Sequence, residues 1–329
     1  MKTFERMRPA ELYCNILKQR EKDGTSFFNK YKHKFVATTC PACQSKGKEI
    51  FEKCGFTHRF CEDCRTIFCS PRPTDESLTV YYNDYEAPKM WTNLLLKTDV
   101  TRKTLQYKPR VEQIISTINK NGKLQNGIAL DLGAGSGAFS FCLKTTGFFQ
   151  DVIALDLSED CVKACRKQGL SASVGKIEDV DANSVDLICI NDLIEHVFDP
   201  SSFLINCFRT LRKGGYISIA TPNGEGFDFK ILKDKTKNIT PPEHLTYFNP
   251  YSLSFILSKV GFQTVLVETP GKLDVEIILR EKKAGYPLKH KNEYLDHILD
   301  QNEEVLADFQ KFLSANKLSS HMLIVAKKK

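Results

Sequence analysis

The chain has 329 residues and a mass of 37.4 kDa, and 41% of its residues are hydrophobic. This length is enough for one α/β domain of ordinary size with a small additional module. The sequence contains no run of about eighteen apolar residues, and its first thirty residues are rich in charge. We therefore expect neither a membrane span nor a secretion signal.

The net charge of +7 is uneven along the chain. Residues 1–110 carry 21 Lys and Arg against 13 Asp and Glu, whereas residues 111–329 carry 26 against 27. A modest basic excess interspersed with acids is typical of a solvated face, and no stripe of basic and aromatic residues accompanies it. The charge pattern therefore argues against a nucleic-acid partner.

Two C-x-x-C pairs lie near the start of the chain, Cys40 with Cys43 and Cys61 with Cys64. Seventeen residues separate the pairs, a spacing typical of zinc ribbons, in which four thiolates surround one Zn²⁺. The alternative is two disulfides or four free thiols. Twelve cysteines without a secretion signal indicate a reducing, cytoplasmic compartment, which favours zinc.

The expected zinc is structural, because a closed four-sulfur site leaves no position for a substrate. A ribbon of about forty residues also has too little core to fold without its metal. Cys54 and Cys69 are near enough in sequence to be alternative ligands, but neither has a paired cysteine. The remaining cysteines fall on apolar faces and are expected to be core thiols: Cys14, Cys142, Cys161, Cys165, Cys189 and Cys207.

A polar connecting segment follows the ribbon and concentrates four aromatic residues, Tyr81, Tyr82, Tyr85 and Trp91. Amphipathic aromatic side chains pack a small module against a domain, and they also line substrate sites. Packing is the simpler interpretation. We expect three parts in the chain: residues 1–75 with the ribbon, a helical connection over 76–110, and a catalytic domain over 111–329 with a helical insertion at about 270–320.

The segment 128–137, IALDLGAGSG, is an apolar strand that passes Asp131 and enters a turn with Gly133, Gly135 and Gly137. A strand, a glycine turn and a helix form the nucleotide-binding corner of a doubly wound α/β fold. A dinucleotide fingerprint has the spacing G-x-G-x-x-G, whereas this turn has G-x-G-x-G with an aspartate two residues before it. That carboxylate would repel a pyrophosphate and suits a cationic ligand.

Strand and helix patterns alternate four more times between residues 151 and 221, which predicts a parallel sheet with helices on both faces. The first of these strands ends in Asp156, a position from which a carboxylate accepts both hydroxyls of a ribose. The next two strands are followed by Ile177 with Glu178 and by Asn191 with Asp192. Polar groups therefore gather at the carboxyl edge of the predicted sheet.

These features resemble a class I S-adenosylmethionine-dependent methyltransferase, over about residues 100–270 and the last strand. The resemblance implies a Rossmann-like sheet of seven strands and a cofactor with a sulfonium, an ammonium and no phosphate. It also implies that adenine lies between an apolar and a polar residue after the third strand. The implied cofactor-binding positions are Asp131, Gly133, Ala134, Gly135, Gly137, Asp156, Leu157, Ile177, Glu178, Asn191 and Asp192.

The carboxyl-terminal half predicts further elements. A helix is expected to open at 193–200, and residues 201–215 predict an amphipathic helix that Gly214 ends. A long connection then reaches a helix over 250–261 and a strand over 262–269, and residues 321–328 form the last strand. The insertion before that strand has helical spacing, so it would make a cap or the surface of a homodimer.

Two histidines are candidates for the base that a hydroxyl acceptor requires. His244 lies in the long connection, and its context, EH with an apolar residue and then YF, resembles the active-site loop of zinc-bearing deoxysugar C-methyltransferases. The resemblance implies that His244 is the base, and the alternative is that His244 only anchors the loop. Those enzymes carry a large extra C-terminal domain that this sequence does not show, so methylation of carbon does not follow from it.

His196, within LIEHVFDP, belongs to a motif shared by methyltransferases of differing substrates. Helix capping or packing beside the cofactor is its simpler role. Glu243 is a third candidate for the catalytic site because it adjoins His244. It need not orient the histidine, since adjacent side chains of an extended segment diverge.

The leading hypothesis is a small-molecule methyltransferase of the methyltransferase-domain 23 type. It would act on a sugar hydroxyl or glycan precursor, with the ribbon closing one side of the acceptor site. The alternative is an RNA or protein methyltransferase that uses the ribbon as a binding module. Against it, the fourth strand ends in NDLI rather than in the N-P-P-Y or D-P-P-Y that stacks a nucleobase or amide. A non-catalytic adapter that binds the cofactor is a third hypothesis.

Overall fold

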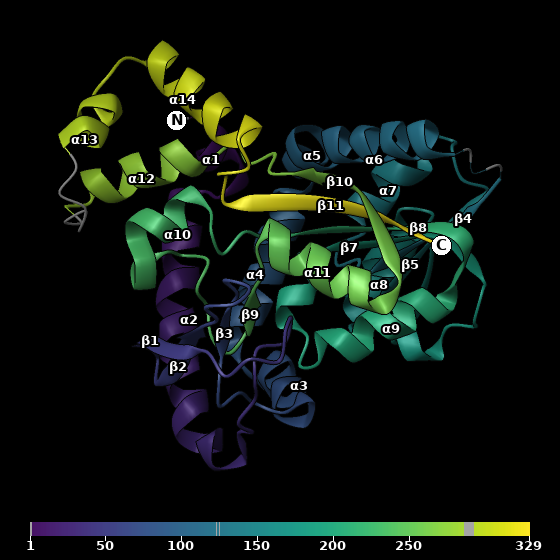
Figure 1. The fold of residues 1–329 in the computed structure, drawn as a ribbon, viewed down its shortest axis with the longest axis horizontal. Helices are drawn as coiled ribbons and strands as arrows, with labels where there is room; N and C mark the ends of the chain where they lie inside the picture. Colours follow the sequence, from purple (N-terminus) through teal and green to yellow (C-terminus); the bar gives the residue numbers. More distant parts are fainter. Residues whose placement is uncertain (1, 123, 125, 286–292) are drawn as a thin grey trace.

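A computed structural model describes residues 2–122, 124, 126–285 and 293–329 of the chain (Figure 1). Its centre is a seven-stranded sheet with the strand order β10-β11-β8-β7-β4-β5-β6. The strands are β4 (Ile128–Leu132), β5 (Asp151–Asp156), β6 (Ser171–Val174), β7 (Val185–Asn191), β8 (Leu211–Pro222), β10 (Phe262–Glu268) and β11 (His321–Lys328).

Strands β4 to β8 are parallel, whereas β11 runs antiparallel to both of its neighbours, β8 and β10. The chain builds outward from β4 to β6, returns to the middle and continues through β7 and β8 toward the other edge. There β11 lies between β8 and the edge strand β10. Ligands of such sheets bind at the carboxyl ends of the strands where the order reverses, here between β4 and β7. The predicted doubly wound, seven-stranded sheet is confirmed.

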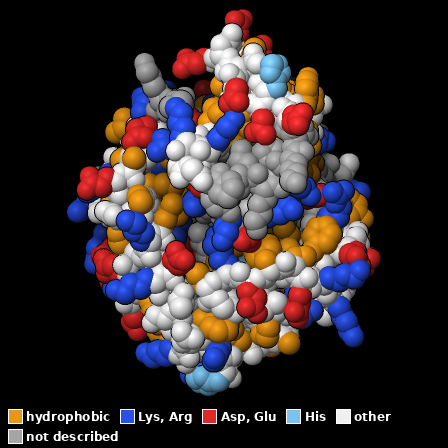
Figure 2. All heavy atoms as spheres, turned by 90° about the vertical axis from the view of Figure 1, so that its left-hand side faces the viewer, with side chains coloured by type: hydrophobic (Ala, Val, Ile, Leu, Met, Phe, Trp, Pro, Cys, Tyr) orange, Lys and Arg blue, Asp and Glu red, His pale blue; other side chains and the backbone are white. Residues whose placement is uncertain are grey.

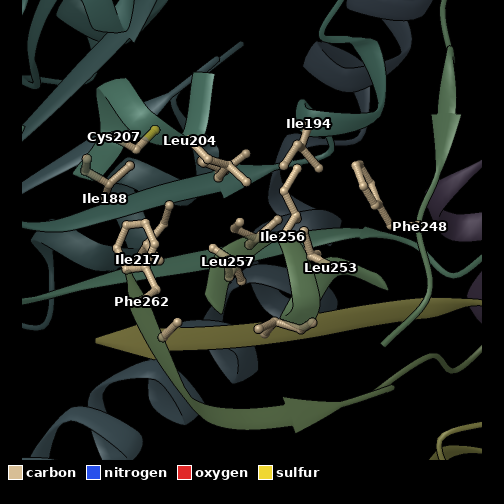
Figure 3. Packing of buried hydrophobic residues seen from close by; sticks show 14 of the residues in the cluster. Ile188, Ile194, Leu204, Cys207, Ile217, Phe248, Leu253, Ile256, Leu257 and Phe262 are labelled. Carbon is tan, nitrogen blue, oxygen red and sulfur yellow. The ribbon is translucent and has the colours of Figure 1, made fainter. Parts of the chain in front are cut away.

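Helices cover both faces of this sheet (Figure 1). Buried residues of β7 alternate between the two faces, since successive side chains of a strand point in opposite directions. Leu187 packs with α6 and α7, and Ile188 packs with α9 and α11, whose Leu204 and Leu257 Figure 3 labels. The helices and turns of this domain are α6 (Lys108–Asn121), α7 (Ala138–Lys144), α8 (Glu159–Lys167), η3 (Ile177–Asp179), η4 (Ile194–His196), α9 (Pro200–Thr210) and α11 (Pro250–Val260).

A second, four-stranded antiparallel sheet lies in the N-terminal region, in the order β1-β2-β3-β9. Three of its strands form the cysteine-bearing ribbon. The fourth comes from the long connection after β8, so the catalytic domain completes the sheet of the ribbon. Its strands are β1 (Lys48–Lys53), β2 (Phe56–Phe60), β3 (Ile67–Cys69) and β9 (Thr246–Tyr247).

A long helix, α2, precedes the ribbon and runs beside it in Figure 1, although the sequence reasoning did not predict it. Phe27 of α2 packs with Phe56 of the ribbon and with Tyr81 of α3 in one buried cluster. The ribbon therefore shares its core with helices on either side of it in sequence. The helices of this region are α1 (Lys2–Met7), α2 (Ala10–Tyr31), η1 (Lys32–Lys34), α3 (Asp75–Asp84), α4 (Glu86–Lys97), α5 (Asp99–Arg102) and the π-helical turn η2 (Lys103–Tyr107).

The insertion before the last strand is helical, as its spacing predicts, although residues 286–292 of it lie outside the described part of the chain. Val275, Ile278, Leu299 and Leu313 form a separate buried cluster with Leu232 of the connection after β8. The insertion therefore packs on that connection. Its helices, with those of the connection, are α10 (Phe227–Leu232), η5 (Lys233–Lys235), α12 (Asp274–Lys283), α13 (Glu293–Leu299) and α14 (Glu303–Ala315).

Three details differ from the sequence-based expectation. The helix expected to end at Gly214 ends at Thr210, because β8 already begins at Leu211 and pairs with β7 there. Residues 194–196 form a single 3₁₀ turn rather than the start of a helix, and α9 begins at Pro200. Cys14 is exposed on α2 and is not a core thiol.

The face shown in Figure 2 carries basic and acidic side chains interspersed with apolar ones. No helix of the described residues is long and apolar enough to cross a membrane.

Candidate functional site

The turn after β4 brings the backbone close to open space at the carboxyl edge of the sheet. Gly133, Gly135 and Gly137 all have positive φ, a conformation that favours glycine. A Cβ on Gly137 would lie 2.9 Å from the Sγ of Cys165, so this position needs glycine for packing. A Cβ on Gly135 would meet nothing within 4 Å, so the backbone here is open to a ligand.

Asp131 is buried at the end of β4, with 1% of its surface exposed. Its carboxylate accepts hydrogen bonds from Ser140 Oγ at 2.6 Å and Asn191 Nδ2 at 3.5 Å. Burial raises the pKa of Asp131 to about 7, although these hydrogen bonds oppose the shift. A cationic ligand beside Asp131 would restore the favoured charged form.

Asp156, at the end of β5, lies across the turn from Gly135. Its carboxylate accepts the backbone N–H of Gly135 and that of Ser158, both at 2.8 Å. Each carboxylate oxygen keeps a second lone pair, so the group can still accept the hydroxyls of a ribose. The adjacent Leu157 is 67% exposed, which suits an apolar surface that a ligand ring covers.

The two positions expected around adenine lie on the turn η3, and their side chains differ in environment. Ile177 is buried in the main core with 2% of its surface exposed. Glu178 accepts a hydrogen bond from Asn206 Nδ2 at 3.1 Å and remains exposed. Contacts of both residues with a cofactor stay predictions.

Asn191 and Asp192 meet two side chains that the sequence reasoning did not single out. Arg110 of α6 donates to Asn191 Oδ1 at 2.6 Å, and His321, the first residue of β11, lies 2.7 Å from Asp192 Oδ1. Burial raises the pKa of Asp192, but the charges of His321, Arg110 and Arg102 outweigh burial and hold that pKa below its usual range. Asp192 has a positive φ of 51°, an uncommon conformation that often marks functional sites.

The two C-x-x-C pairs come together as predicted. The Sγ atoms of Cys40 and Cys64 are 3.4 Å apart, those of Cys43 and Cys61 are 3.3 Å apart, and all four lie within 4.8 Å of one another. A tetrahedron with zinc–sulfur bonds of about 2.3 Å has edges of about 3.8 Å, so this cluster fits a zinc ion. Cys54 and Cys69 are not members of the cluster.

Each pair sits in the same kind of turn. The backbone N–H of Gln44 donates to Cys40 O, and that of Arg65 donates to Cys61 O, both at 2.8 Å. Gln44 and Arg65 both have positive φ. The two turns therefore present their sulfurs in matching geometry, which the spacing alone predicted.

The ribbon is joined to the connection that carries His244. Phe68 of β3 pairs with Thr246 of β9, and the backbone N–H of Cys69 donates to Leu245 O at 2.8 Å. On its other side, Leu245 donates its own N–H to Glu195 O at 2.8 Å. The segment after His244 is thus held between the ribbon and the turn η4.

His244 and His196 lie edge to face, with ring centroids 4.7 Å apart. The Nδ1 of His244 is 2.7 Å from Asn238 O. Because a carbonyl only accepts, Nδ1 carries the proton and Nε2 has a free lone pair. Burial, the neighbouring His196 and Arg20 hold the pKa of His244 well below its usual range, so the ring is neutral at pH 7.

His196 has a different set of contacts, since its Nδ1 is 2.8 Å from the hydroxyl of Tyr82. Glu195 beside it is buried and accepts from Thr221 Oγ1 at 2.8 Å. Burial, with the nearby charge of Asp192, raises the pKa of Glu195 to about 8. This carboxyl is therefore neutral near pH 7.

Glu243 does not hydrogen-bond to His244 through its side chain. Its carboxylate accepts from Arg20 Nε at 3.1 Å and Arg20 Nη2 at 2.7 Å, and also from Tyr81 OH at 3.3 Å. Arg20 in turn lies over the ring of Trp91, 4.4 Å from its centroid. This buried ion pair anchors the loop to α2, so an anchoring role for Glu243 accounts for its contacts.

The four aromatic residues of the connecting segment divide between two roles. Tyr81 and Tyr85 stack at 5.1 Å and join the core beside Phe27, as packing residues do. Tyr82 keeps 38% of its surface exposed and reaches His196. Trp91 packs against the buried cluster of Tyr13 and Ile16, and its ring contacts the guanidinium groups of two arginines. Tyr82 is therefore the one of the four that is placed to line a site.

Comparison with known families agrees with this fold. Residues 130–219 match the family Methyltransf_11, described as a methyltransferase domain. The match covers the strands from β4 to β8, which carry the glycine turn and the polar strand ends. The fold and the family match support a class I methyltransferase domain that includes residues 130–219.

Curated relatives match part of the chain. The chain is 31% identical over 122 residues to a ubiquinone biosynthesis O-methyltransferase of Bordetella avium, covering 34% of this chain and 50% of that protein. A protein of the same name from Xanthomonas oryzae is 34% identical over 103 residues, covering 29% and 42%. The chain thus spans half or less of the length of these relatives.

Among solved structures, the chain resembles one from the complex between the Haloferax volcanii Trm112 methyltransferase activator and a methyltransferase. The TM-score is 0.50 at 17% identity, covering 73% of this chain and 94% of that chain. This similarity concerns the fold alone.

Proposed function

We propose that the protein transfers a methyl group from S-adenosylmethionine to a hydroxyl of a small molecule, a sugar or glycan precursor, with His244 as the base. The observation that carries this proposal is the state of His244. Its ring is neutral, its Nδ1 donates to Asn238 O, and no described residue donates a hydrogen bond to its Nε2. The loop is joined to the turn after β7 through Leu245 and Glu195, and Glu195 accepts from Thr221 of β8.

The cofactor site follows from the strand ends. Asp131, with its raised pKa, faces the cationic part of the cofactor, the open backbone at Gly135 accommodates its close approach, and Asp156 accepts the ribose hydroxyls. Arg110 beside Asn191 suits the carboxylate of the methionine part, because guanidinium binds carboxylates well. S-Adenosylmethionine supplies an activated methyl group when bound.

The residues of the chain then have two tasks. They hold the acceptor oxygen in line with the methyl group, at roughly 3 to 3.5 Å, and they remove one proton. The neutral His244 can accept that proton at Nε2. Tyr82 offers a partly apolar surface to a sugar ring, and the relatives named O-methyltransferases favour an oxygen as acceptor atom.

We also propose one structural zinc ion on Cys40, Cys43, Cys61 and Cys64. The supporting observation is that β9 completes the ribbon sheet, so metal in the ribbon would order the loop that carries His244. This favours a positioning role over a separate binding module. The cytoplasmic location and a homodimer stay predictions. So does the division of the chain into residues 1–75, 76–110 and 111–329, although β9 of the third part pairs with a strand of the first.

The test is a screen with S-adenosylmethionine labelled with ¹³C in its methyl group. Sugar nucleotides, glycan precursors, RNA and protein would be offered separately, and NMR of the product would identify the methylated atom. We expect an O-methyl signal from a small molecule. Transfer to RNA or protein alone, or to carbon, would contradict the proposal.

A further inference from the structure

Three arginines, Arg8, Arg102 and Arg110, have no hydrogen-bonded carboxylate partner among the described residues. Arg102 is 6% exposed, and its three nitrogens donate only to neutral oxygens, those of Thr98, Gln106 and Met7. Arg110 is 8% exposed and donates to the amide oxygen of Asn191. Burial of a cation without a paired anion is costly, which points to an anionic ligand.

Arg8 is the third of these arginines and adjoins Arg102, which donates to Met7 O. Its guanidinium lies over the rings of Phe4 and Tyr13, at 5.4 and 5.2 Å from their centroids. Its Nε is buried and has no hydrogen-bond partner among the described residues. Two guanidinium groups therefore adjoin, and neither has a hydrogen-bonded carboxylate among the described residues.

Arg20, which lies near Arg102, differs in that it has a carboxylate partner. It shares the ring of Trp91 with Arg102, but Arg20 has both oxygens of Glu243 as partners. A buried arginine is usually paired with a carboxylate. Arg20 has such a partner, whereas Arg102 beside it has none among the described residues.

Asp192 relates two of these arginines to the carboxyl end of β7. Asp192 at the end of β7 is electrostatically coupled to both Arg102 and Arg110, but its direct partner is His321, at 2.7 Å. The cofactor does not balance this excess of positive charge. S-Adenosylmethionine carries a sulfonium, an ammonium and one carboxylate, so its binding adds a net positive charge and its carboxylate can neutralise only one arginine.

We propose that Arg8 and Arg102 form an anion subsite, so that the acceptor carries a phosphate or carboxylate group. This inference rests on the proposed function, because it assigns the substrate class of the same site. Arg110, beside Asn191, remains for the carboxylate of the cofactor. The anionic group then lies on the side of α1 and α5, and the hydroxyl to be methylated lies on the side of His244.

The test uses calorimetry on the full chain with its ribbon metal, saturated with S-adenosylhomocysteine. Inorganic phosphate and pyrophosphate probe one chemistry, and acetate and citrate probe the other. We expect one of these pairs to bind, and Arg8→Gln and Arg102→Gln each to weaken that binding about tenfold or more, as loss of a charged hydrogen bond does.

Two controls keep the result interpretable. Arg212→Gln removes an arginine that pairs with Asp186 at the other end of β8 and is expected to change nothing. Arg8 makes no hydrogen bond through its side chain among the described residues, so Arg8→Gln should fold even if Arg102→Gln does not.

The outcomes separate this inference from the proposed function. If S-adenosylhomocysteine itself does not bind, the proposed function fails. If it binds but none of the four anions does, or if the wild type and Arg8→Gln bind them equally, the anion subsite is refuted while the cofactor site stands.

Discussion

The side-chain amide of Asn249 donates a hydrogen bond to the backbone carbonyl of Cys64 at 2.9 Å. Asn249 also caps α11, since its Oδ1 accepts from Ser252 N at 2.9 Å. One residue thus joins a cysteine turn of the ribbon to the start of a helix of the catalytic domain. Together with the pairing of β3 and β9, this contact makes the loop of His244 depend on the ribbon.

The first prediction therefore concerns metal. We expect one equivalent of zinc in the purified protein, and we expect Cys61→Ser to lose both the metal and the folded ribbon. Acceptor turnover should fall when the ribbon unfolds. S-Adenosylhomocysteine binding should persist, because Asp131 and Asp156 lie on strands of the seven-stranded sheet and not on the ribbon. Metal analysis measures the zinc content, and calorimetry on the same sample measures S-adenosylhomocysteine binding. Cys14→Ser, at an exposed cysteine, is the control.

Retention of stoichiometric metal after replacement of all four cysteines would exclude this site. A ribbon variant that loses metal and keeps full acceptor turnover would show that the ribbon does not position the loop.

The second prediction concerns the ribose contact of Asp156. Asp156→Ala should weaken S-adenosylmethionine binding at least tenfold, because each hydrogen bond to a charged acceptor contributes about 1.5 to 3 kcal/mol. The loss of the bonds to Gly135 and Ser158 would add to this effect. Calorimetry compares the variant with Asp160→Ala, an exposed carboxylate on the next helix. Equal affinity in the wild type and Asp156→Ala would refute the assignment, and NAD should not bind.

Much of the fold could be predicted because its elements depend on local patterns. The glycine turn after β4, the continuous apolar run of β7 and the two cysteine pairs each specify their own geometry from a few adjacent residues. The doubly wound sheet followed from the alternation of these strands with helices, and its seven strands from the resemblance to class I methyltransferases. The same reasoning missed α2, because its buried face carries Arg20 and Asp23 between the apolar Ile16 and Phe27.

The rest of the site depends on contacts between distant segments. Arg110, Tyr82 and His321 reach Asn191, His196 and Asp192 from elements 81 to 129 residues away in sequence. No spacing rule links such pairs, so the sequence alone offered no signal for them. Glu243 illustrates the opposite error, because adjacency to His244 suggested a shared role while its side chain pairs with Arg20.

The third prediction concerns pH. With its pKa raised to about 7 by burial, Asp131 gains a proton as the pH falls through that range and loses its attraction for a cation. S-Adenosylmethionine affinity should therefore decrease from pH 8 to pH 6, by a factor approaching about ten per unit below the pKa. Asp131→Asn should bind weakly with little dependence on pH. A wild-type affinity that is constant over this range would contradict the role of Asp131.

The last prediction concerns the base. His244→Ala should lower kcat about 10² to 10⁴ fold, the range that general bases contribute, while S-adenosylmethionine affinity stays nearly unchanged. Because the pKa of His244 lies well below its usual range, the neutral ring is already the form present at pH 7. Wild-type kcat should thus stay level above neutrality and fall only on the acid side, as the ring takes up a proton.

His196→Ala is the matched comparison, because the two rings are in contact and only His244 is proposed to accept the proton of the acceptor hydroxyl. The hydrogen bond between His196 and Tyr82 joins η4 to α3, so its loss should lower the melting temperature or weaken cofactor binding more than it lowers kcat. Steady-state kinetics with the acceptor identified by the labelled-methyl screen distinguish the two. Full turnover in His244→Ala with none in a folded His196→Ala would reverse the roles and leave His244 as an anchor of the loop.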